Sequence, residues 1–418
     1  MLTKITNFAF LLFIFSLPFV NPLYFTVSGQ RVFLSELAFV AALLLLVFQF
    51  ATNKQKPKFY RFYIPLIFYA GALTLSTVFS VSPRTSAIKL AGEFYLIGIS
   101  VLTFLWISET KDIKKIATVW IGASMIVSFV SLITLFLFYF DRSSFLLTLT
   151  LSKYGTLPVG NYPRIQSLFL NPNMLCHYLT ISWIFLFAAF KFGWLNKWLI
   201  IAAGVLFTVA TAFTISPGIG GVLLAAGVWF YFENRSEEKA LFSKLSLAIG
   251  LTAALLFFVS TVGYPKLADP DSGIGLQNLS LEPSVRLIAW ENSVNTFLGY
   301  PVFGKGLETD VARTRYILPS GENIYLTDSH QMWLNVAGQS GITGFLALLF
   351  LCIYLIKGPQ LFRFEGENQI IRTGLAIAFV SAFIYQGFFG SYENARHLWV
   401  LIGLLGWAQD YTPDPGQN

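Results

Sequence analysis

Residues 116–140 read IATVWIGASMIVSFVSLITLFLFYF and contain no charged side chain. A helix needs roughly 20 mainly apolar residues to cross the hydrocarbon of a bilayer, at about 1.5 Å of rise per residue. This stretch is therefore long enough to span a membrane. The fold class depends on how many similar stretches the rest of the chain holds.

Eleven further stretches are comparable in length and apolar character, which makes twelve candidate spans in all. The sequence thus predicts an all-α polytopic membrane protein with about 12 transmembrane helices. Only Ser216-Pro217-Gly218 separates the seventh span from the eighth, so this pair is expected either to cross fully or to form a tight re-entrant hairpin. The predicted spans are 5–27, 33–51, 62–80, 88–107, 116–140, 168–190, 198–215, 218–232, 245–263, 334–356, 372–390 and 395–409.

The overall composition agrees with this class. Of the 418 residues, 55% are hydrophobic and 12% are charged, against about 25% charged in an ordinary soluble domain. The net charge is +7, which in a soluble protein would suggest a nucleic-acid partner. With a cytoplasmic N-terminus, however, 16 of the 28 Lys and Arg residues fall on the inner side, as expected for positively charged cytoplasmic loops. The basic excess therefore orients the chain in the membrane and implies no nucleic acid.

The predicted spans divide the chain into four parts. Spans one to nine occupy 1–263, a long outer loop occupies 264–333, spans ten to twelve occupy 334–409, and a cytoplasmic tail occupies 410–418. The first span is expected to be retained, because no small-residue cleavage site follows its apolar core. Cys176 and Cys352 are expected near opposite faces of the membrane, too far apart for a disulfide.

The outer loop is unusually long, and its pattern predicts internal structure. Pro283 is expected in the first turn of a helix, where a missing N–H costs nothing. An apolar stripe at helical spacing continues from it and places this helix at the membrane interface or under the loop. Gly304-Lys305-Gly306 then predicts a tight backbone path. The stripe consists of Leu287, Trp290, Val294, Phe297 and Leu298.

His330 closes this loop just before the tenth span, and it is one of three histidines in the chain. Histidine titrates near neutral pH and can take a proton from a hydroxyl, so this position suits a general base. The alternative is an ordinary hydrogen-bonded interfacial histidine. His177 and His397 lie inside or beside spans and are weaker candidates. No cluster of Cys and His has the spacing of metal ligands, so no metal site is expected.

Arginines on the outer side form a second group of candidates. A guanidinium group binds phosphate through two parallel hydrogen bonds and keeps its charge when partly buried. The alternative is interfacial anchoring, with the charged head reaching for water. Glu93, Glu291 and Glu393 are candidates for orienting His330 or an arginine. The arginines are Arg164, Arg286, Arg313 and Arg315, with Arg84 and Arg396 at the edges of other spans.

Three segments carry a more specific pattern. The first is RIQSLFLNPN at 164–173, the second joins SVR at 284–286 and Trp290 to PVFGKG at 301–306, and the third is SHQMWL at 329–334 followed by Gly338, Gly341 and Gly344. In this order, around one long outer loop, they resemble the O-antigen ligase and polymerase family of bacterial envelope glycosyltransferases. The resemblance covers most of the chain and implies a GT-C-like fold.

The resemblance also implies a reaction and roles for individual residues. Arg286 would bind the diphosphate of an undecaprenyl-linked glycan, Arg164 would join that site, and His330 would deprotonate or orient the acceptor hydroxyl. The glycan would move as a whole with inversion at the anomeric carbon, releasing undecaprenyl diphosphate and needing no metal or other cofactor. The site would face the periplasm from the bacterial inner membrane. We favour an O-antigen ligase acting on lipid A-core in lipopolysaccharide synthesis, with a polymerase of the same family next and a protein O-glycosylating enzyme also open.

One departure from the family pattern concerns the turn between the seventh and eighth spans. Many ligases carry Ser-Arg-Gly there, whereas this chain has Ser216-Pro217-Gly218. If that arginine helps to hold phosphate, another cation must replace it, and Arg313 and Arg315 are the candidates.

A twelve-span count also occurs in secondary transporters, and a lipid flippase is a related alternative. Both would be expected to carry charges along a central path near the membrane midplane. In this chain the charges inside spans are Glu36, Lys89 and Glu93, all in the outer half. A transport function is therefore ranked below a transferase.

Overall fold

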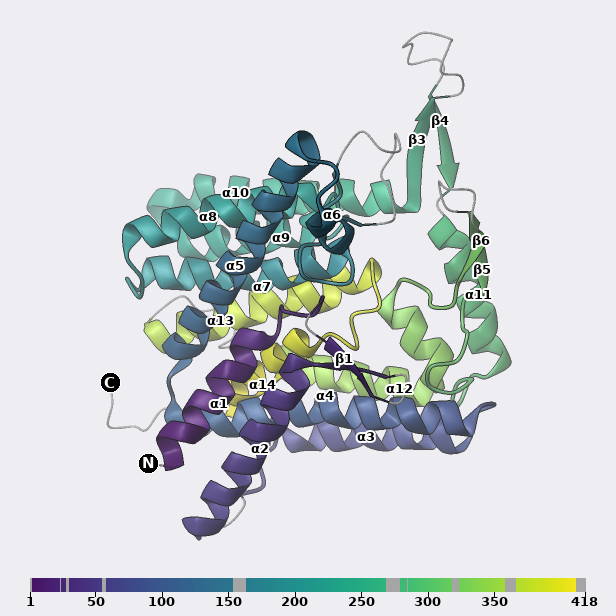
Figure 1. The fold of residues 1–418 in the computed structure, drawn as a ribbon, viewed down its shortest axis with the longest axis horizontal. Helices are drawn as coiled ribbons and strands as arrows, with labels where there is room; N and C mark the ends of the chain where they lie inside the picture. The colour runs from purple at the N-terminus through teal and green to yellow at the C-terminus, as the bar shows by residue number, and fades with distance from the viewer. Residues whose placement is uncertain are drawn as a thin grey trace.

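A computed structural model describes residues 2–22, 24–27, 30–54, 58–152, 163–267, 279–283, 285–317, 323–357 and 366–410. Helices dominate it (Figure 1), as predicted from the long apolar stretches. The α-helices are α1 (Leu2–Ser16), α2 (Leu34–Thr52), α3 (Tyr63–Val78), α4 (Pro83–Thr110), α5 (Ile113–Phe140), α6 (Phe145–Thr150), α7 (Pro172–Lys191), α8 (Lys197–Phe213), α9 (Ile219–Glu233), α10 (Ala240–Val262), α11 (Val285–Gly299), α12 (Met332–Ile356), α13 (Glu367–Phe379) and α14 (Arg396–Asp410). Short helical pieces are η1 (Glu237–Lys239), the π-helical turn η3 (Val380–Tyr385) and η4 (Gln386–Phe388).

Three short antiparallel hairpins complete the described structure. Strand β1 (Tyr24–Val27) pairs with β2 (Gln30–Phe33), β3 (Gly263–Leu267) with β4 (Leu279–Pro283), and β5 (Thr314–Ile317) with β6 (Asn323–Leu326). The β3–β4 hairpin projects away from the helices at the upper right of Figure 1. Two of the hairpins lie in the predicted outer loop, which is therefore partly strand as well as helix.

The predicted fold class is confirmed, with changes at element ends. Each of the twelve predicted segments overlaps a helix, and seven helices among the described residues are long and apolar enough to cross a membrane. Four shorter apolar helices accompany them: α1, α3, α8 and α9. The first predicted span, 5–27, is too long, because α1 ends at Ser16 and Tyr24 already begins a strand. Pro18 and Pro22 lack the N–H group that a continuing helix would need.

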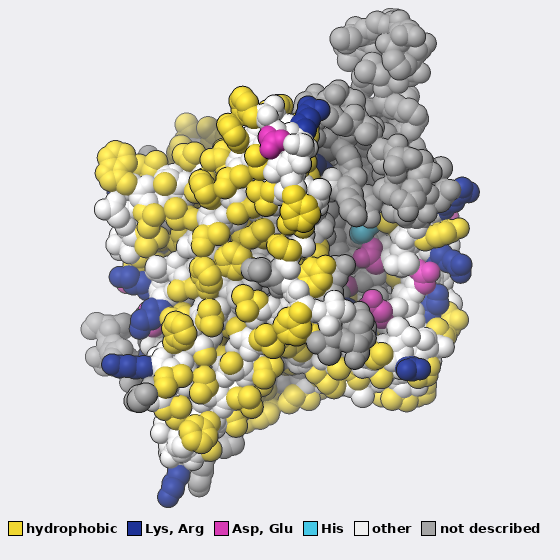
Figure 2. Space-filling view, viewed as in Figure 1, with side chains coloured by type: hydrophobic (Ala, Val, Ile, Leu, Met, Phe, Trp, Pro, Cys, Tyr) yellow, Lys and Arg dark blue, Asp and Glu magenta, His cyan; other side chains and the backbone are white. Residues whose placement is uncertain are grey.

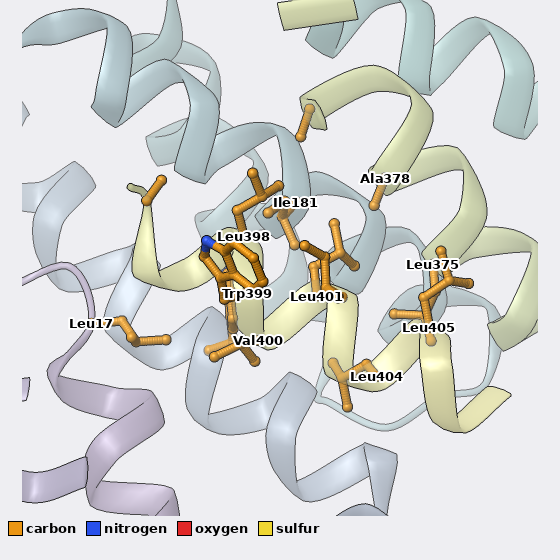
Figure 3. Packing of buried hydrophobic residues seen from close by; sticks show 14 of the residues in the cluster. Leu17, Ile181, Leu375, Ala378, Leu398, Trp399, Val400, Leu401, Leu404 and Leu405 are labelled. Atoms are coloured by element: carbon orange, nitrogen blue, oxygen red, sulfur yellow. The ribbon is translucent and has the colours of Figure 1, made fainter. Parts of the chain in front are cut away.

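Helix α14 forms the centre of the bundle. Every residue from His397 to Ala408 is buried, and α14 packs against α4 and α13. Figure 3 shows Leu398, Leu401 and Leu405 of α14 among side chains from other helices, including Ile181 of α7 and Leu375 of α13. A helix that is apolar all round is expected to be buried on all sides.

The outer surface of the bundle is apolar in its middle and charged toward its ends. Figure 2 shows hydrophobic side chains covering most of this face, with most of the Lys and Arg near its left and right edges. Exposed large side chains such as Phe68, Leu256 and Phe350 contribute to this apolar surface. A continuous apolar surface of this kind is what a lipid-facing bundle requires.

Different parts of the chain lie at the two ends of the bundle. At one end, the Asp410 carboxylate at the end of α14 accepts hydrogen bonds from the backbone N–H of Phe62 at 3.0 Å and from the Tyr354 hydroxyl at 2.6 Å. At the other end, on the right of Figure 1, lie α11 and the β5–β6 hairpin. The inner ends of two predicted spans therefore meet the start of the predicted tail at one end, and the described part of the predicted outer loop lies at the other.

Candidate active site

Helix α12 begins directly after His330 and is broken at Gly341, whose backbone has φ 63° and ψ −164°. A residue with a side chain rarely adopts this conformation, so glycine is needed there. The turn formed by residues 300–308, which we call the docked turn, lies against this break. Its backbone bonds to α12 are Lys305 N to Gly338 O (2.9 Å), Gly306 N to Gln339 O (3.0 Å) and, in the reverse direction, Ile342 N to Pro301 O (2.8 Å).

The docked turn also contacts the turn between α3 and α4. The backbone N–H of Val81 donates to the Lys305 carbonyl at 3.1 Å, and the Ser86 hydroxyl donates to the Leu307 carbonyl at 2.9 Å. A Cβ atom on Gly306 would overlap the side chain of Ser80, so this approach also depends on glycine. The second and third sequence motifs are thus in direct contact. They lie about 30 residues apart in the sequence, a length of chain that could have kept them far apart in space.

Helix α11 begins later than predicted. Pro283 is the last residue of β4, and the helix begins only at Val285, so Pro283 is not in its first turn. Ala289 and Ser293 of this helix are fully buried, whereas Leu298 of the predicted apolar stripe is 66% exposed. The placement of the stripe at the membrane interface or under the loop stays a prediction.

His330 is held by the carboxylate two residues before it. Asp328 Oδ1 lies 3.0 Å from His330 Nδ1 and accepts a hydrogen bond from the His330 backbone N–H at 3.1 Å. The His330 backbone has φ 47°, and its side chain is 42% exposed. With Nδ1 donating to a carboxylate, Nε2 is the ring nitrogen that can accept a proton. The sequence placed Asp328 beside His330, but its role as the orienting carboxylate was missed; the signal was the two-residue spacing that aspartate uses in local turns.

Arg286, in the first turn of α11, lies close enough to act on His330. Partial burial lowers the pKa of His330, the nearby positive charge of Arg286 lowers it further, and Asp328 opposes both by raising it. The net direction is downward, so the imidazole is neutral at pH 7. The structure therefore brings together two predicted site residues that lie at opposite ends of the loop.

Arg164 is fixed at a different edge of the site, against the turn between α8 and α9. Its Nε donates to the Thr214 carbonyl at 3.2 Å, and its Nη2 donates to Asn173 Oδ1 at 3.1 Å. The Ser216 hydroxyl donates to the same Asn173 oxygen at 2.8 Å. The first motif thus carries its own arginine to the Ser216-Pro217-Gly218 turn, where the sequence lacks the arginine found in many ligases.

Tyr392 was not singled out from the sequence. The positive charges of both Arg286 and Arg164 act on it. It lies between η4 and α14 and is 3% exposed. The run SYENARH at 391–397 was the available signal, because so many polar residues between two spans are unusual in this chain. Three of its polar members are buried: Tyr392, Glu393 and His397 are each at most 6% exposed.

Arg313 and Arg315 are exposed at the start of the β5–β6 hairpin. Thr314 between them turns inward and accepts a hydrogen bond from Asn292 of α11 at 3.1 Å. The replacement of the missing cation by one of these arginines thus remains a prediction, whereas Arg164 is the arginine found at the turn itself. Of the other outer arginines, Arg396 pairs with Glu36 at 2.5 Å.

The three candidate orienting carboxylates have other surroundings. Glu291 lies on the exposed side of α11. Glu393 accepts from Asn335 Nδ2 at 2.5 Å, and burial raises the pKa of Glu393 to about 7, with a further contribution from Asp328. Glu93 belongs to a group around Lys89 Nζ, whose partners are Glu93 (3.7 Å), Glu308 (3.4 Å) and Asn394 (2.7 Å). Figure 2 shows histidine and acidic side chains gathered in a hollow of this face.

The two remaining histidines form a buried pair. His177 Nδ1 lies 2.6 Å from His397 Nε2, and His177 Nε2 lies 2.9 Å from the Ala382 carbonyl in η3. Cys176 and Cys352 are both free and buried. Among the described residues, no group of three His, Cys, Asp or Glu side chains is placed to hold a metal ion.

Comparison with known proteins gives one match. Residues 199–349 match a family model described as O-antigen ligase, and this range contains α8 to α11, the docked turn, His330 and the break in α12. No curated protein and no solved structure was found to match the chain. The match of residues 199–349 to the O-antigen ligase model agrees with the family resemblance predicted from the sequence.

Proposed function

We propose that the protein is a membrane glycosyltransferase that moves a glycan from undecaprenyl diphosphate to an acceptor hydroxyl. The preferred reaction is that of an O-antigen ligase, with lipid A-core as the acceptor at the periplasmic face of the inner membrane. The observation that carries the proposal is the His330 imidazole held by Asp328 at one end of the bundle, where the positive charge of Arg286 acts on it. The family match supports a ligase or polymerase type of membrane enzyme.

The geometry suits transfer to a hydroxyl. His330 Nε2 accepts the hydroxyl proton as the acceptor oxygen forms a bond to the anomeric carbon. On the opposite side of that carbon, the bond to the diphosphate oxygen breaks, and the electron pair leaves with the diphosphate. Attack from the opposite side inverts the anomeric centre. Asp328 holds Nδ1 and stabilises the imidazolium ion that forms.

The arginines contribute to the other half of the reaction. Negative charge develops on the departing diphosphate, and fixed cations that meet this charge lower the barrier. Arg164 is held by Thr214 and Asn173, so its guanidinium group is fixed before the substrate arrives and needs little reorganisation during the reaction. Arg286 is in the first turn of α11.

The charge distribution supports an orientation for the site. The predicted inner loops together with the N-terminus hold 16 of the 28 Lys and Arg residues, and the predicted inner ends at Phe62 and Tyr354 contact Asp410 at the end of the bundle away from α11. Positive loops remain in the cytoplasm. We therefore assign both termini to the cytoplasm and the His330 site to the periplasm.

Purified protein incubated with an undecaprenyl-diphosphate-linked glycan tests this function. With lipid A-core present, we expect glycan-modified lipid A-core and free undecaprenyl diphosphate as products. His330→Ala should lower the rate about 10²–10⁴-fold, the usual contribution of a positioned base, while donor binding is kept. Arg142→Ala, which removes an exposed arginine at the end of α5, is the control and should leave the rate unchanged.

Two outcomes would change the proposal. A ladder of lengthened lipid-linked glycans in the absence of lipid A-core would assign the protein as a polymerase of the same family. A His330→Ala variant that transfers glycan at the rate of the unmodified protein would show that His330 is not the base.

A further inference from the structure

The hydroxyl of Tyr392 is a buried polar group. Tyr392 is 3% exposed, and its hydroxyl oxygen has no hydrogen-bond partner in the part of the chain that the structure describes. A buried donor without a partner destabilises the folded protein. Because buried polar groups in native proteins are nearly always paired, such a group points to a ligand that completes it.

The surroundings of this hydroxyl define the charge of that ligand. Burial raises the pKa of Tyr392, while the positive charges of Arg286 and Arg164 oppose the rise, so the hydroxyl lies in the electrostatic field of both guanidinium groups. Arg286 comes from α11 and Arg164 from the segment before α7. A protonated phenol and two guanidinium groups all donate hydrogen bonds. A group bound between them must therefore accept hydrogen bonds and carry negative charge, as phosphate does.

The buried pair of His177 and His397 sets the position of the Tyr392 ring. The ring stacks on His177 with 4.1 Å between the ring centroids. The Ala382 carbonyl can only accept, so His177 Nε2 must donate to it, and His177 Nδ1 must then accept from His397 Nε2. Both imidazoles are thereby fixed in orientation. The hydroxyl thus has a defined position before any ligand binds.

We propose that Tyr392 is a third ligand of the donor diphosphate, whose hydroxyl donates a hydrogen bond to a phosphate oxygen held between Arg286 and Arg164. This inference rests on the proposed function, because it takes the lipid diphosphate as the bound anion. Tyr392 acts by binding and gives up no proton. Its hydroxyl and the two guanidinium groups form one anion site. Arg286 places this site beside His330, and Arg164 places it beside the α8–α9 turn.

The test is binding of undecaprenyl diphosphate to purified full-length protein in lipid nanodiscs, with undecaprenyl monophosphate as a second probe. Tyr392→Phe removes only the hydroxyl. A hydrogen bond to a charged group contributes about 1.5–3 kcal/mol, so we expect the dissociation constant for the diphosphate to rise about tenfold to 100-fold. Without ligand, the variant should unfold at the same or a higher temperature, because an unpaired buried hydroxyl is lost.

Tyr178→Phe is the matched control. Tyr178 is also fully buried, and its ring stacks on Trp120 with 5.0 Å between centroids. Its hydroxyl likewise has no hydrogen-bond partner in the described chain, but no arginine of the described chain acts on it. This variant should bind the diphosphate as the unmodified protein does.

The outcomes separate the inference from the proposed function. If the unmodified protein binds the diphosphate and Tyr392→Phe binds it equally well, Tyr392 is not a ligand, and the proposed function stands. Equal loss of affinity in Tyr392→Phe and Tyr178→Phe would also overturn the inference, because it would reflect a general effect on the bundle. If the unmodified protein binds neither lipid, the donor class of the proposed function is wrong, and the inference fails with it.

Discussion

The His330 side of the candidate site is held by backbone hydrogen bonds, whereas the Tyr392 side is held by side chains that meet deep in the bundle. On the first side, the docked turn bonds to the break in α12 through the main chain of Lys305, Gly306 and Ile342. On the second side, Tyr392 lies on a pair of histidines from α7 and α14. The first side therefore depends on glycines that allow close approach, and the second depends on polar groups that satisfy one another.

Gly341→Ala should have the largest effect, because it changes the His330 side of the site, which is held by backbone hydrogen bonds and is called the backbone-built side below. At φ 63° and ψ −164° a side chain is strained by about 1–3 kcal/mol, and the new Cβ would also overlap the Val302 carbonyl. We expect the docked turn to be displaced, with loss of most transferase activity and a lower unfolding temperature in detergent. Both are measured on the same purified sample.

Gly71→Ala provides the comparison for that change. Gly71 lies within α3, and a Cβ built on it meets no atom within 4 Å. Alanine favours a helix over glycine by about 1 kcal/mol, so this variant should be as stable as the unmodified protein or slightly more so. Full activity in Gly341→Ala would show that the break in α12 does not need its glycine conformation.

The backbone-built side was also the more predictable one from sequence. Apolar length predicted the helices, and the glycines at 304, 306, 338 and 341 marked the places where main chains meet. Even so, the contact between the docked turn and α12 could not be predicted, because glycine spacing shows where close approach is allowed and not what approaches. The same limit applied to α11, whose apolar stripe did not show that Ala289 and Ser293 would be fully buried.

The Tyr392 side of the site, which is held by side chains and is called the side-chain-built side below, was largely missed in the sequence for a physical reason. His177 lies more than 200 residues from Tyr392 and His397 in the sequence, and each of the three taken alone resembles a core aromatic or an isolated histidine in an apolar helix. Their function as a group depends on distances between helices, which periodicity does not contain. Asp328 was nearer to prediction, because its contact with His330 is local.

Asp328→Asn should have the next largest effect, on rate and on pH dependence. The Asp328 carboxylate raises the pKa of His330, so its removal should lower that pKa further. Activity requires neutral His330 and rises with pH through this pKa; the acid limb of the kcat profile should therefore move to lower pH. Loss of the orienting charge should also reduce the plateau rate on the order of tenfold to 100-fold, part of the total base contribution.

The pH profile separates this role from a structural one. A variant that is merely less stable would lose activity at every pH without moving the acid limb. An unmoved limb, at a reduced rate, would mean that Asp328 only shapes the turn through its bond to the His330 backbone. Rescue by Asp328→Glu would require the longer side chain to reach Nδ1, so little rescue is expected.

His397→Phe should have the smallest effect, and it tests how far the side-chain-built side acts on the substrate. The change keeps an aromatic ring between Phe169 and Tyr178 but removes the donor to His177 Nδ1. An unpaired buried acceptor should lower the free energy of unfolding by about 1–3 kcal/mol. Because His177 then loses its fixed orientation under Tyr392, the KM for the donor should rise severalfold while kcat changes little. Combined with Tyr392→Phe, the change should raise KM no further, since both act through the same hydroxyl.

An additional rise in KM in the double variant would mean that the histidine pair affects donor binding by another route. Lower stability with an unchanged KM would mean that the pair only stabilises the bundle.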